Sequence, residues 1–303
     1  MHDRPLARAA VLIHPVPADL LQQVERALAE DIGAGDLTAA LIPEERRGRA
    51  HIITREPAVL CGQAYVDATF ANPAVATPAD VRIEWKAAEG AQLAAGQLLC
   101  VLEGPARALL TGERTALNFL QLLSATATAA RRYAELVAGT DCRVLDTRKT
   151  IPGLRTAQKY AVRVGGGYNH RIGLFDGILI KENHIMAAGS IAKAVAAARL
   201  ATRAIPVEVE VESLDELRQA IEAGADIAML DDFPMTQLRE AVARNRAAPK
   251  PLKLEASGGV TMATIRGIAE TGVDYVSVGS ITKHVQAVDL SMRFEYSEPG
   301  SGA

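Results

Sequence analysis

The stretch Cys142-Arg-Val-Leu-Asp-Thr-Arg-Lys-Thr150 decides the predicted fold of this chain, because a short apolar run ends in it on polar groups and two adjacent cations. The same arrangement, an apolar run that ends on polar side chains, occurs five more times further along the chain. We predict a β-strand in each case. The six strands are predicted to begin near Val144, Ile178, Val207, Ile227, Leu252 and Tyr275.

Helical patterns lie between these strands. Apolar residues recur at helical spacing in residues 191–202, 214–223, 236–247 and 261–271. Strands that alternate with helices indicate βαβ units and a parallel sheet. We therefore predict an α/β protein in which residues 114–286 form an incomplete, TIM-like βα barrel of about six parallel strands. Ligands bind at the carboxyl ends of such strands, so the polar strand ends should surround one site.

The residues before the barrel predict a smaller α+β sheet domain, residues 18–113. A helix is predicted to start at Pro17-Ala18-Asp19, and strands are predicted over 49–60, 81–85 and 97–102. Residues 1–17 contain three prolines and no sustained period, and we interpret them as an extension. A long helical pattern over 112–139 is predicted to connect the two domains.

The end of the chain alternates strictly between apolar and polar residues. Its apolar residues are Val288, Leu290, Met292, Phe294 and Tyr296. This period of two predicts a half-buried strand, and we expect residues 287–297 to return to the sheet of the N-terminal domain.

Composition and charge exclude several classes of function. The 303 residues are 49% hydrophobic and 23% charged, which is typical of a globular protein with a barrel-sized core. The net charge is −3, whereas residues 146–182 contain seven Lys/Arg and three acidic residues, a local charge of +4. A basic region in an acidic protein favours a small anionic ligand and argues against nucleic-acid binding.

Cysteine usage and hydropathy bear on the cellular compartment. Cys61, Cys100 and Cys142 are an odd set with no Cys-x-x-Cys spacing, so neither a disulfide framework nor a zinc site is predicted. No apolar run approaches the ~20 residues of a membrane span, and the amino terminus lacks the apolar core of a signal peptide. We therefore expect a cytoplasmic protein with no membrane contact.

Three glutamates follow one another at period two in one predicted strand. Glu208, Glu210 and Glu212 share one face of it, and the intervening valines share the other. Valines suit the helix layer of a barrel, so the glutamates would point inward, where they need cations or a metal ion. Lys149 and Lys181, which we place at the ends of neighbouring strands, are candidate partners. The alternative is an edge strand with a solvated acidic face.

The last three strands also end on groups suited to ligands. Asp231 ends one of them, which weakens the interpretation of the glutamates as an edge strand. Ser257-Gly258-Gly259 precedes a helical pattern, and Gly279-Ser280 ends the following strand. Backbone N–H groups there can bind phosphate, as the last two βα loops of barrels do, although simple turn glycines are the alternative. Gly165-Gly166-Gly167 is interpreted as a helix end.

Two further groups of cations are candidates for anion binding. Arg114 lies near the predicted start of the connecting helix, where a cation opposes the helix dipole. An anion bound at the helix amino terminus would explain it, and a solvated arginine fits equally well. His170-Arg171 combines an imidazole with a guanidinium, which together can bind carboxylates.

Three runs of this sequence closely resemble the quinolinate phosphoribosyltransferase family. They are Asp146-Thr-Arg-Lys-Thr-Ile-Pro-Gly-Leu-Arg155, Gly165-Gly-Gly-Tyr-Asn-His-Arg171 and Ile180-Lys-Glu-Asn-His184. The resemblance extends from Glu30-Asp-Ile-Gly-Ala-Gly-Asp-Leu-Thr38 to Leu290. Thr282-Lys283-His284 stands where many members have Thr-His-Ser, so no role is assigned to these residues.

The resemblance implies transfer of phosphoribose from phosphoribosyl pyrophosphate (PRPP) to the ring nitrogen of quinolinate, with loss of pyrophosphate and CO2. The product is nicotinate mononucleotide, a precursor of NAD. The residues implied to hold the quinolinate carboxylates are Arg114, Arg148, His170 and Arg171. Lys149 and Lys181 are implied to face both substrates, and Thr147 belongs to the same substrate-binding run.

The resemblance also implies how PRPP and a metal ion are bound. Glu210 and Asp231 match positions near the ribose, where carboxylates stabilise positive charge and help to order Mg²⁺. The implied phosphate-binding residues are Ser257, Gly258, Gly259, Gly279 and Ser280. Lys149, Glu210 and Asp231 are the implied catalytic residues. In the family, the arginine that matches Arg114 enters the partner's site, so a homodimer or larger homo-oligomer with a shared active site is expected.

Other activities remain compatible with these residues. A related enzyme of the same fold could use another pyridine or a different acceptor. A lyase could use Lys149 or Lys181 as a Schiff-base nucleophile. A catalytically silent phosphosugar-binding module is a third possibility, although it would not need Lys149, Glu210 and Asp231 together.

Overall fold

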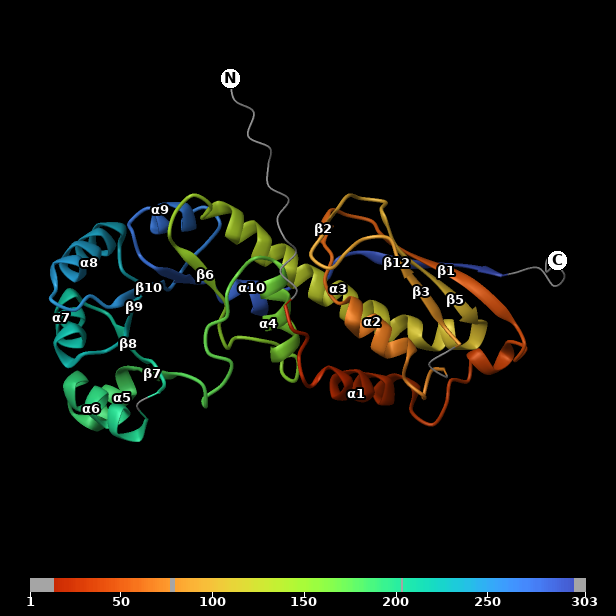
Figure 1. Ribbon diagram of the computed structural model, residues 1–303, viewed down its shortest axis with the longest axis horizontal. Helices are drawn as coiled ribbons and strands as arrows, with labels where there is room; N and C mark the ends of the chain where they lie inside the picture. The colour runs from red at the N-terminus through yellow and green to blue at the C-terminus, as the bar shows by residue number, and fades with distance from the viewer. Residues whose placement is uncertain (1–13, 77–79, 203, 297–303) are drawn as a thin grey trace, which may run out of the picture.

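The computed structural model describes residues 14–76, 80–202 and 204–296. These residues form two parts that lie on either side of one long helix, α3 (Ala106–Leu136) (Figure 1). An antiparallel sheet lies at one end of the molecule and a set of parallel strands with outer helices lies at the other (Figure 1). The predicted extension, residues 1–17, falls mostly outside the described residues.

The N-terminal part is built on a four-stranded antiparallel sheet. Its strand order is β12 (Leu290–Tyr296), β1 (Arg47–Thr54), β5 (Leu98–Pro105) and β3 (Arg82–Trp85). The C-terminal strand β12 therefore pairs with β1, in antiparallel register. The remaining elements of this part are α1 (Leu20–Ile32), the 3-10 turn η1 (Ala39–Leu41), α2 (Gln63–Phe70), and the short pair β2 (Ala58–Val59) and β4 (Gln92–Leu93).

Apolar side chains explain why this sheet packs on helices. Ile52 of β1 and Leu102 of β5 are fully buried in one cluster with Phe70 of α2 and Leu109 and Leu117 of α3. Deleting such a side chain would cost about 2 to 5 kcal/mol, because the cavity adds to the lost transfer free energy. The first half of α3 thus belongs to the N-terminal core.

The C-terminal part contains the six predicted parallel strands. They are β6 (Arg143–Leu145), β7 (Ile178–Ile180), β8 (Val207–Val211), β9 (Ile227–Asp231), β10 (Lys253–Ser257) and β11 (Tyr275–Ser277). The sheet order is β6-β11-β10-β9-β8-β7, and every pair is parallel. The prediction of an incomplete barrel is confirmed, because β6 and β7 do not pair with each other in the described chain.

The two lysines expected beside the glutamates follow the two edge strands of the sheet. Lys181 follows β7, which pairs with β8, so its predicted position next to the glutamate strand is confirmed. Lys149 follows β6, which pairs with β11 at the other edge, so its predicted position on a neighbouring strand is wrong. The gap is bordered by the segment after α4, where Tyr168 forms a single parallel bridge to Leu145 of β6.

The barrel helices pack against the outward faces of the strands. They are α4 (Arg155–Val164), α5 (Glu182–Ala188), α6 (Ile191–Ala201), α7 (Leu214–Ala223), α8 (Met235–Ala247), α9 (Ile265–Ala269) and α10 (Ser280–Lys283). Val207, Val209 and Val211 are completely buried in this layer, as period-two alternation predicted. Within the part of the chain that the structure describes, no helix combines the length and apolar character that crossing a bilayer needs.

Two helix boundaries differ from the predictions. The connecting helix begins at Ala106 instead of near residue 112, because apolar residues of its first turns, such as Leu109, pack in the N-terminal core. Helix α9 begins at Ile265, four residues after the predicted start, because Thr261 and Thr264 form a hydrogen-bonded turn first.

Candidate functional site

The register of the strands determines which side chains point into the barrel. On β8 the valines face the helices, so Glu208 and Glu210 face inward. Glu210 lies level with Met229 of β9, and two residues later Asp231 lies level with Ser257 of β10. Glu210, Asp231 and Ser257 therefore all point inward near the carboxyl ends of their strands. We call this end of the barrel the carboxyl edge.

Lys181 and Glu210 form an ion pair at the carboxyl edge. Lys181 immediately follows β7 and is the N-cap residue of α5, where its backbone N–H donates to Nδ1 of His184 at 3.0 Å. The Lys181 side chain is 47% exposed and that of Glu210 is 15% exposed. This confirms the inward orientation of Glu210, whereas Glu212 is exposed beyond the end of the strand.

The loop after β6 is fixed against the loop after β11. The hydroxyl of Thr282 donates to the Lys149 carbonyl at 2.9 Å, and Gln158 donates to the Thr282 carbonyl at 2.9 Å. The backbone N–H of Lys149 donates to Oγ1 of Thr147 at 3.1 Å. A β-carbon on Gly279 would lie 3.1 Å from Cδ of Lys149, so the absence of a side chain lets the two loops approach.

The other predicted phosphate-binding residues lie at or just after the ends of β10 and β11, where Ser257 ends β10 and Ser280 begins α10. Gly258 has a φ of +89°, and a β-carbon there would lie 2.1 Å from Oδ1 of Asp232. The Asp232 backbone N–H donates to the Ser257 carbonyl at 3.0 Å. Because α9 starts only at Ile265, the glycines do not directly precede a helix, and the predicted helix amino terminus at this loop is wrong. Ser280 lies 3.2 Å from the Tyr133 hydroxyl.

Arg148 and Arg171 form a cationic pair beside the barrel. Burial and the nearby charge of Arg148 both lower the pKa of Arg171. Arg171 donates to the Gly177 carbonyl at 3.2 Å, and Nε of Arg148 is buried with no hydrogen-bond partner among the described residues. A buried N–H group without an acceptor is costly, and an anionic ligand would satisfy it.

A buried network that the sequence did not reveal holds the segment with His170 and Arg171. Asp146, fully buried at the end of β6, accepts hydrogen bonds from Lys159, from the Asn169 amide at 2.6 Å and from the His170 backbone N–H at 2.9 Å. Lys159 is 2% exposed and also donates to the His170 carbonyl at 2.9 Å. Burial raises the pKa of Asp146 and lowers that of Lys159, and their mutual attraction opposes both shifts.

Lys159 therefore cannot bind a ligand, although the sequence counted it among the cations of the basic region. Arg155 is also engaged, since it donates to Thr150 at 3.1 Å and to the Ile172 carbonyl at 3.2 Å. Arg163 lies over the ring of Tyr168. Of the seven cations counted in residues 146–182, these three contact groups of the protein itself, so fewer cations are available to a ligand than the sequence indicated.

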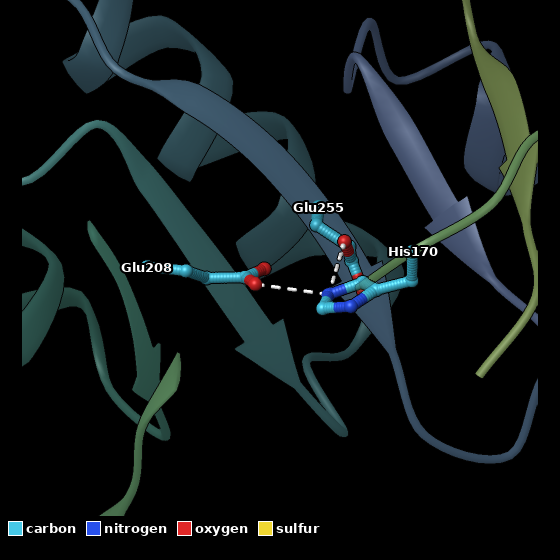
Figure 2. Close-up of side chains that lie close together, drawn as sticks. All are labelled: His170, Glu208 and Glu255. Atoms are coloured by element: carbon cyan, nitrogen blue, oxygen red, sulfur yellow. Dashed lines mark ion pairs between the residues drawn. The ribbon is translucent and has the colours of Figure 1, made fainter. Parts of the chain in front are cut away.

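His170 lies between two inward-facing carboxyl groups (Figure 2). Its Nε2 atom is 2.9 Å from Oε2 of Glu208 and 3.5 Å from Oε2 of Glu255, on β8 and β10. Its Nδ1 atom accepts the backbone N–H of Arg171 at 2.8 Å. Both ring nitrogens are therefore occupied by protein groups, and the predicted contact of His170 with a substrate carboxylate is not available in this arrangement.

Two models of known protein domains match the sequence of this chain. A sequence model described as "Quinolinate phosphoribosyl transferase, C-terminal domain" matches residues 126–293, more than half of the chain. The corresponding N-terminal domain matches residues 36–124. The chain belongs to the quinolinate phosphoribosyl transferase family.

Individual members of the family are similar over nearly the whole chain. A probable nicotinate-nucleotide pyrophosphorylase [carboxylating] of Bacillus subtilis is 42% identical, over 87% of this chain and 89% of its own length. The human nicotinate-nucleotide pyrophosphorylase [carboxylating] is 37% identical, over 95% of each chain. The solved structure of the nicotinate-nucleotide pyrophosphorylase from Francisella tularensis has a TM-score of 0.87 at 47% identity and covers 93% of this chain and 98% of its own.

Arg114 is the one predicted site residue that lies away from the barrel. It is exposed in the third turn of α3, on the half of the helix that packs in the N-terminal core, and makes no ion pair with the described residues. The helix-terminus argument for Arg114 is therefore wrong, because α3 starts eight residues before it.

Proposed function

We propose that this member of the quinolinate phosphoribosyl transferase family transfers phosphoribose from PRPP to the ring nitrogen of quinolinate, releases pyrophosphate and CO2, and forms nicotinate mononucleotide. The single observation that carries this proposal within the structure is the buried, unpaired Nε of Arg148 beside Arg171. Two guanidinium groups at one place suit a ligand with two neighbouring carboxylates, because each can bind a carboxylate through two parallel hydrogen bonds.

We assign quinolinate to the gap between the two edge strands. Arg148 and Lys149 follow β6, Lys181 follows β7, and Arg171 lies on the segment between them. These cations come from both borders of the gap, so a small dianion could contact all of them. His170 contributes to this site by holding Arg171, as its two engaged ring nitrogens indicate.

We assign PRPP to the carboxyl edge. Ser257, Gly258 and Gly259 on one loop and Gly279 and Ser280 on the next supply backbone N–H groups for phosphate. Glu210 and Asp231 lie inward at the same edge, where carboxylate oxygens suit Mg²⁺ that is also bound by substrate phosphates. Bound Mg²⁺ would neutralise charge on the pyrophosphate leaving group.

The residues at this edge then have distinct tasks. Lys149 and Lys181 supply positive charge beside both anionic substrates, while Glu210 and Asp231 stabilise positive charge that develops on ribose as pyrophosphate leaves. Ribosylation makes the ring nitrogen cationic, so the ring can accept the electron pair left when the adjacent carboxylate departs as CO2. Decarboxylation therefore needs no separate cofactor.

We further propose a homodimer, or a larger homo-oligomer built from such dimers, with shared active sites. Arg114 is exposed on the N-terminal part and makes no ion pair within the described residues, although its charge acts on the neighbouring Glu113, and this exposure supports a role at the barrel of another subunit. The proposed division places residues 18–113 in the N-terminal domain and residues 114–286 in the barrel, with the boundary inside α3. Leu117 packs in the N-terminal core, so the part of α3 that carries Arg114 packs with the N-terminal domain although it follows that boundary. Removing Arg114 would leave a substrate carboxylate under-paired, a loss of about 2 to 5 kcal/mol.

The reaction is tested by incubating the protein with PRPP, Mg²⁺ and either quinolinate or nicotinate, and by measuring mononucleotide and CO2. We expect both products with quinolinate and no CO2 with nicotinate. Equal mononucleotide formation from nicotinate would contradict the proposal. Trapping with borohydride in the presence of a carbonyl compound tests the Schiff-base lyase, and we expect no labelled lysine.

The shared site is tested by co-expressing Arg114→Ala with Lys149→Ala. A mixed dimer then contains one site with both defects and one site with neither. We expect mixed dimers to regain up to half of the wild-type activity, whereas each variant alone is inactive. Mixed dimers that form and stay inactive would show that Arg114 acts within its own chain.

A further inference from the structure

The interior of the barrel contains a second group of polar side chains, below the carboxyl edge. Glu208 on β8 and Glu255 on β10 point inward around Nε2 of His170 (Figure 2). The two glutamates are 4% and 1% exposed. We call His170, Glu208 and Glu255 the His170 cluster. Oε1 of each glutamate is buried without a hydrogen-bond partner among the described residues.

The His170 cluster forms the inner wall of a cavity that lies at the opposite end of the barrel from the carboxyl edge. The cavity has a volume of about 490 Å³. Arg143, Ile178, Ile227 and Tyr275, the first residues of four barrel strands, line it together with the cluster. The amino ends of the strands therefore surround this cavity, and Arg171 of the proposed quinolinate site also lines it.

The charges of the His170 cluster cannot all be present together. Two ionised carboxylates close to one another in a buried place repel each other strongly, so one of them binds a proton. Burial and the charge of Glu208 raise the pKa of Glu255 to about 8. Burial lowers the pKa of His170, but the hydrogen bond to Glu208 and the charges of Glu255 and Glu208 outweigh it, so the pKa of His170 is raised. Together, the two glutamates therefore favour binding of one proton by the cluster, in addition to the proton of the neutral imidazole.

The backbone of Arg171 decides where this extra proton resides. It could occupy Nδ1 of His170 or a carboxyl oxygen of Glu255. Nδ1 already accepts the N–H of Arg171 at 2.8 Å, and an accepting nitrogen has no proton. The imidazole is therefore neutral, with its own proton on Nε2 facing Glu208, and the extra proton lies on Glu255.

We propose that Glu255 is kept as an uncharged carboxylic acid inside the barrel, and that loss of its proton weakens quinolinate binding through His170 and Arg171. Glu255 is thus a positioning residue that makes substrate binding sensitive to alkaline pH. The inference rests on the proposed function, since it concerns the same substrate. The affected group is Arg171, whose guanidinium already experiences the charge of Glu208. A second buried negative charge would weaken the attraction of Arg171 for a dianion.

Other charged groups surround the cluster. Those that line the cavity or act on the cluster are Arg143 and Cys142 on or beside β6, Arg171 and Asp176 on the segment before β7, Tyr275 on β11 and Lys159 on α4. Burial raises the pKa of Cys142 to about 12, and that thiol stays neutral near pH 8. The residues of β9 that line the cavity or lie level with Glu255 are Ile227 and Met229, which do not ionise.

The first experiment measures quinolinate affinity by calorimetry at pH 7 and pH 9. If only the protonated form binds, the dissociation constant of the wild-type protein should rise about tenfold between these values. In Glu255→Gln, which keeps an oxygen acceptor for Nε2 and cannot ionise, the ratio of the two constants should be close to one. In Glu208→Gln the pKa of Glu255 loses its second-largest upward contribution, so the rise should occur at lower pH.

Glu270→Gln is the matched control, because it makes the same chemical change in an exposed pair with Arg266. It should keep the wild-type ratio. A tenfold rise that persists in Glu255→Gln would overturn the proposal. Thermal melting of each variant shows whether the protein is folded, and Glu255→Met tests the same loss of titration if Glu255→Gln does not fold.

The second experiment is independent of substrate. Infrared spectroscopy at neutral pH should show the band of a protonated carboxyl group that disappears at alkaline pH and is missing in Glu255→Gln. Absence of that band from the wild-type protein would overturn the proposal, as would a stoichiometric divalent ion that Glu255→Gln loses. If the wild-type protein does not bind quinolinate at all, the proposed function fails, and the infrared band still decides the protonation of Glu255.

Discussion

Two ion pairs that include residues at the carboxyl ends of barrel strands differ in how far they are exposed to water. At the carboxyl edge, Lys181 is 47% exposed and pairs with Glu210, which is 15% exposed. In the buried network next to the His170 cluster, Lys159 and Asp146 are only 3% and 0% exposed at their side chains. Exposed pairs can exchange partners with a ligand at small cost, whereas buried pairs hold the backbone in place. The exposed pair of Lys181 with Glu210 is thus suited to binding a ligand, and the buried pair of Lys159 with Asp146 is suited to holding the fold.

The largest effect should come from breaking the buried pair. We expect Asp146→Ala to lower the free energy of unfolding by about 3 to 5 kcal/mol, because Lys159 is left buried without its anion. Denaturant unfolding at neutral pH measures this change. Glu240→Ala, which removes an exposed pair with Arg244, is the control and should cost no more than about 1 kcal/mol. Similar losses in both variants would remove the distinction between the two kinds of pair.

Most of the fold could be predicted from the sequence. Alternation placed Val207, Val209 and Val211 outward and the glutamates of β8 inward, because the side-chain period of a strand is fixed. The pairing of β6 with β11 instead of β7 could not be predicted, since it depends on contacts between residues far apart in the chain. The start of α3 was missed for a similar reason, because Leu109 is fixed by tertiary packing.

The position of candidate site residues at the carboxyl ends of strands was predictable where polar residues end apolar runs, as at Lys181 and Asp231. The role of a charged residue was not predictable where its charge is paired with another charge in the protein interior. Lys159 resembles its cationic neighbours in the sequence, yet it lies buried against Asp146. The sequence did contain a sign that Lys159 is buried. Ala157, Tyr160 and Ala161 lie close to it in the sequence of one helix, so apolar residues flank Lys159 on more than one face. For Glu255, the only sign of burial in the sequence was its place on the inward face of β10, two residues before Ser257.

The next largest effect should be catalytic. We expect Glu210→Gln and Asp231→Asn to lower kcat about 10²- to 10³-fold, because their charges act when positive charge develops on ribose. Quinolinate affinity should change much less, since neither residue belongs to the proposed carboxylate site. Steady-state kinetics and calorimetry of each variant separate the two quantities. Equal losses in turnover and in binding would count against the proposed role.

A smaller effect is expected from the glycine loop after β10. Gly258→Ala should cost about 1 to 3 kcal/mol, because an L-residue is strained at its φ and the added carbon meets Asp232. The φ of Gly258 is +89°, and a β-carbon there would lie 2.1 Å from Oδ1 of Asp232. Gly259→Ala is the matched control, with a φ of +55° and 3.8 Å to the same atom. If the KM for PRPP rises equally in both variants, the tight approach of Gly258 is not what shapes the phosphate loop.

The smallest effect on stability should follow from removing the lysine at the carboxyl edge. Lys181→Met should change the free energy of unfolding by no more than about 1 kcal/mol, because nearly half of the Lys181 side chain already contacts water and Glu210 can be hydrated when it loses its partner. The same substitution should strongly impair turnover, since it removes a cation proposed to face both substrates. Denaturant unfolding and steady-state kinetics on one preparation measure both quantities. A loss of stability as large as that of Asp146→Ala would mean that the pair of Lys181 with Glu210 is structural, and the contrast between the exposed and the buried ion pair would not hold.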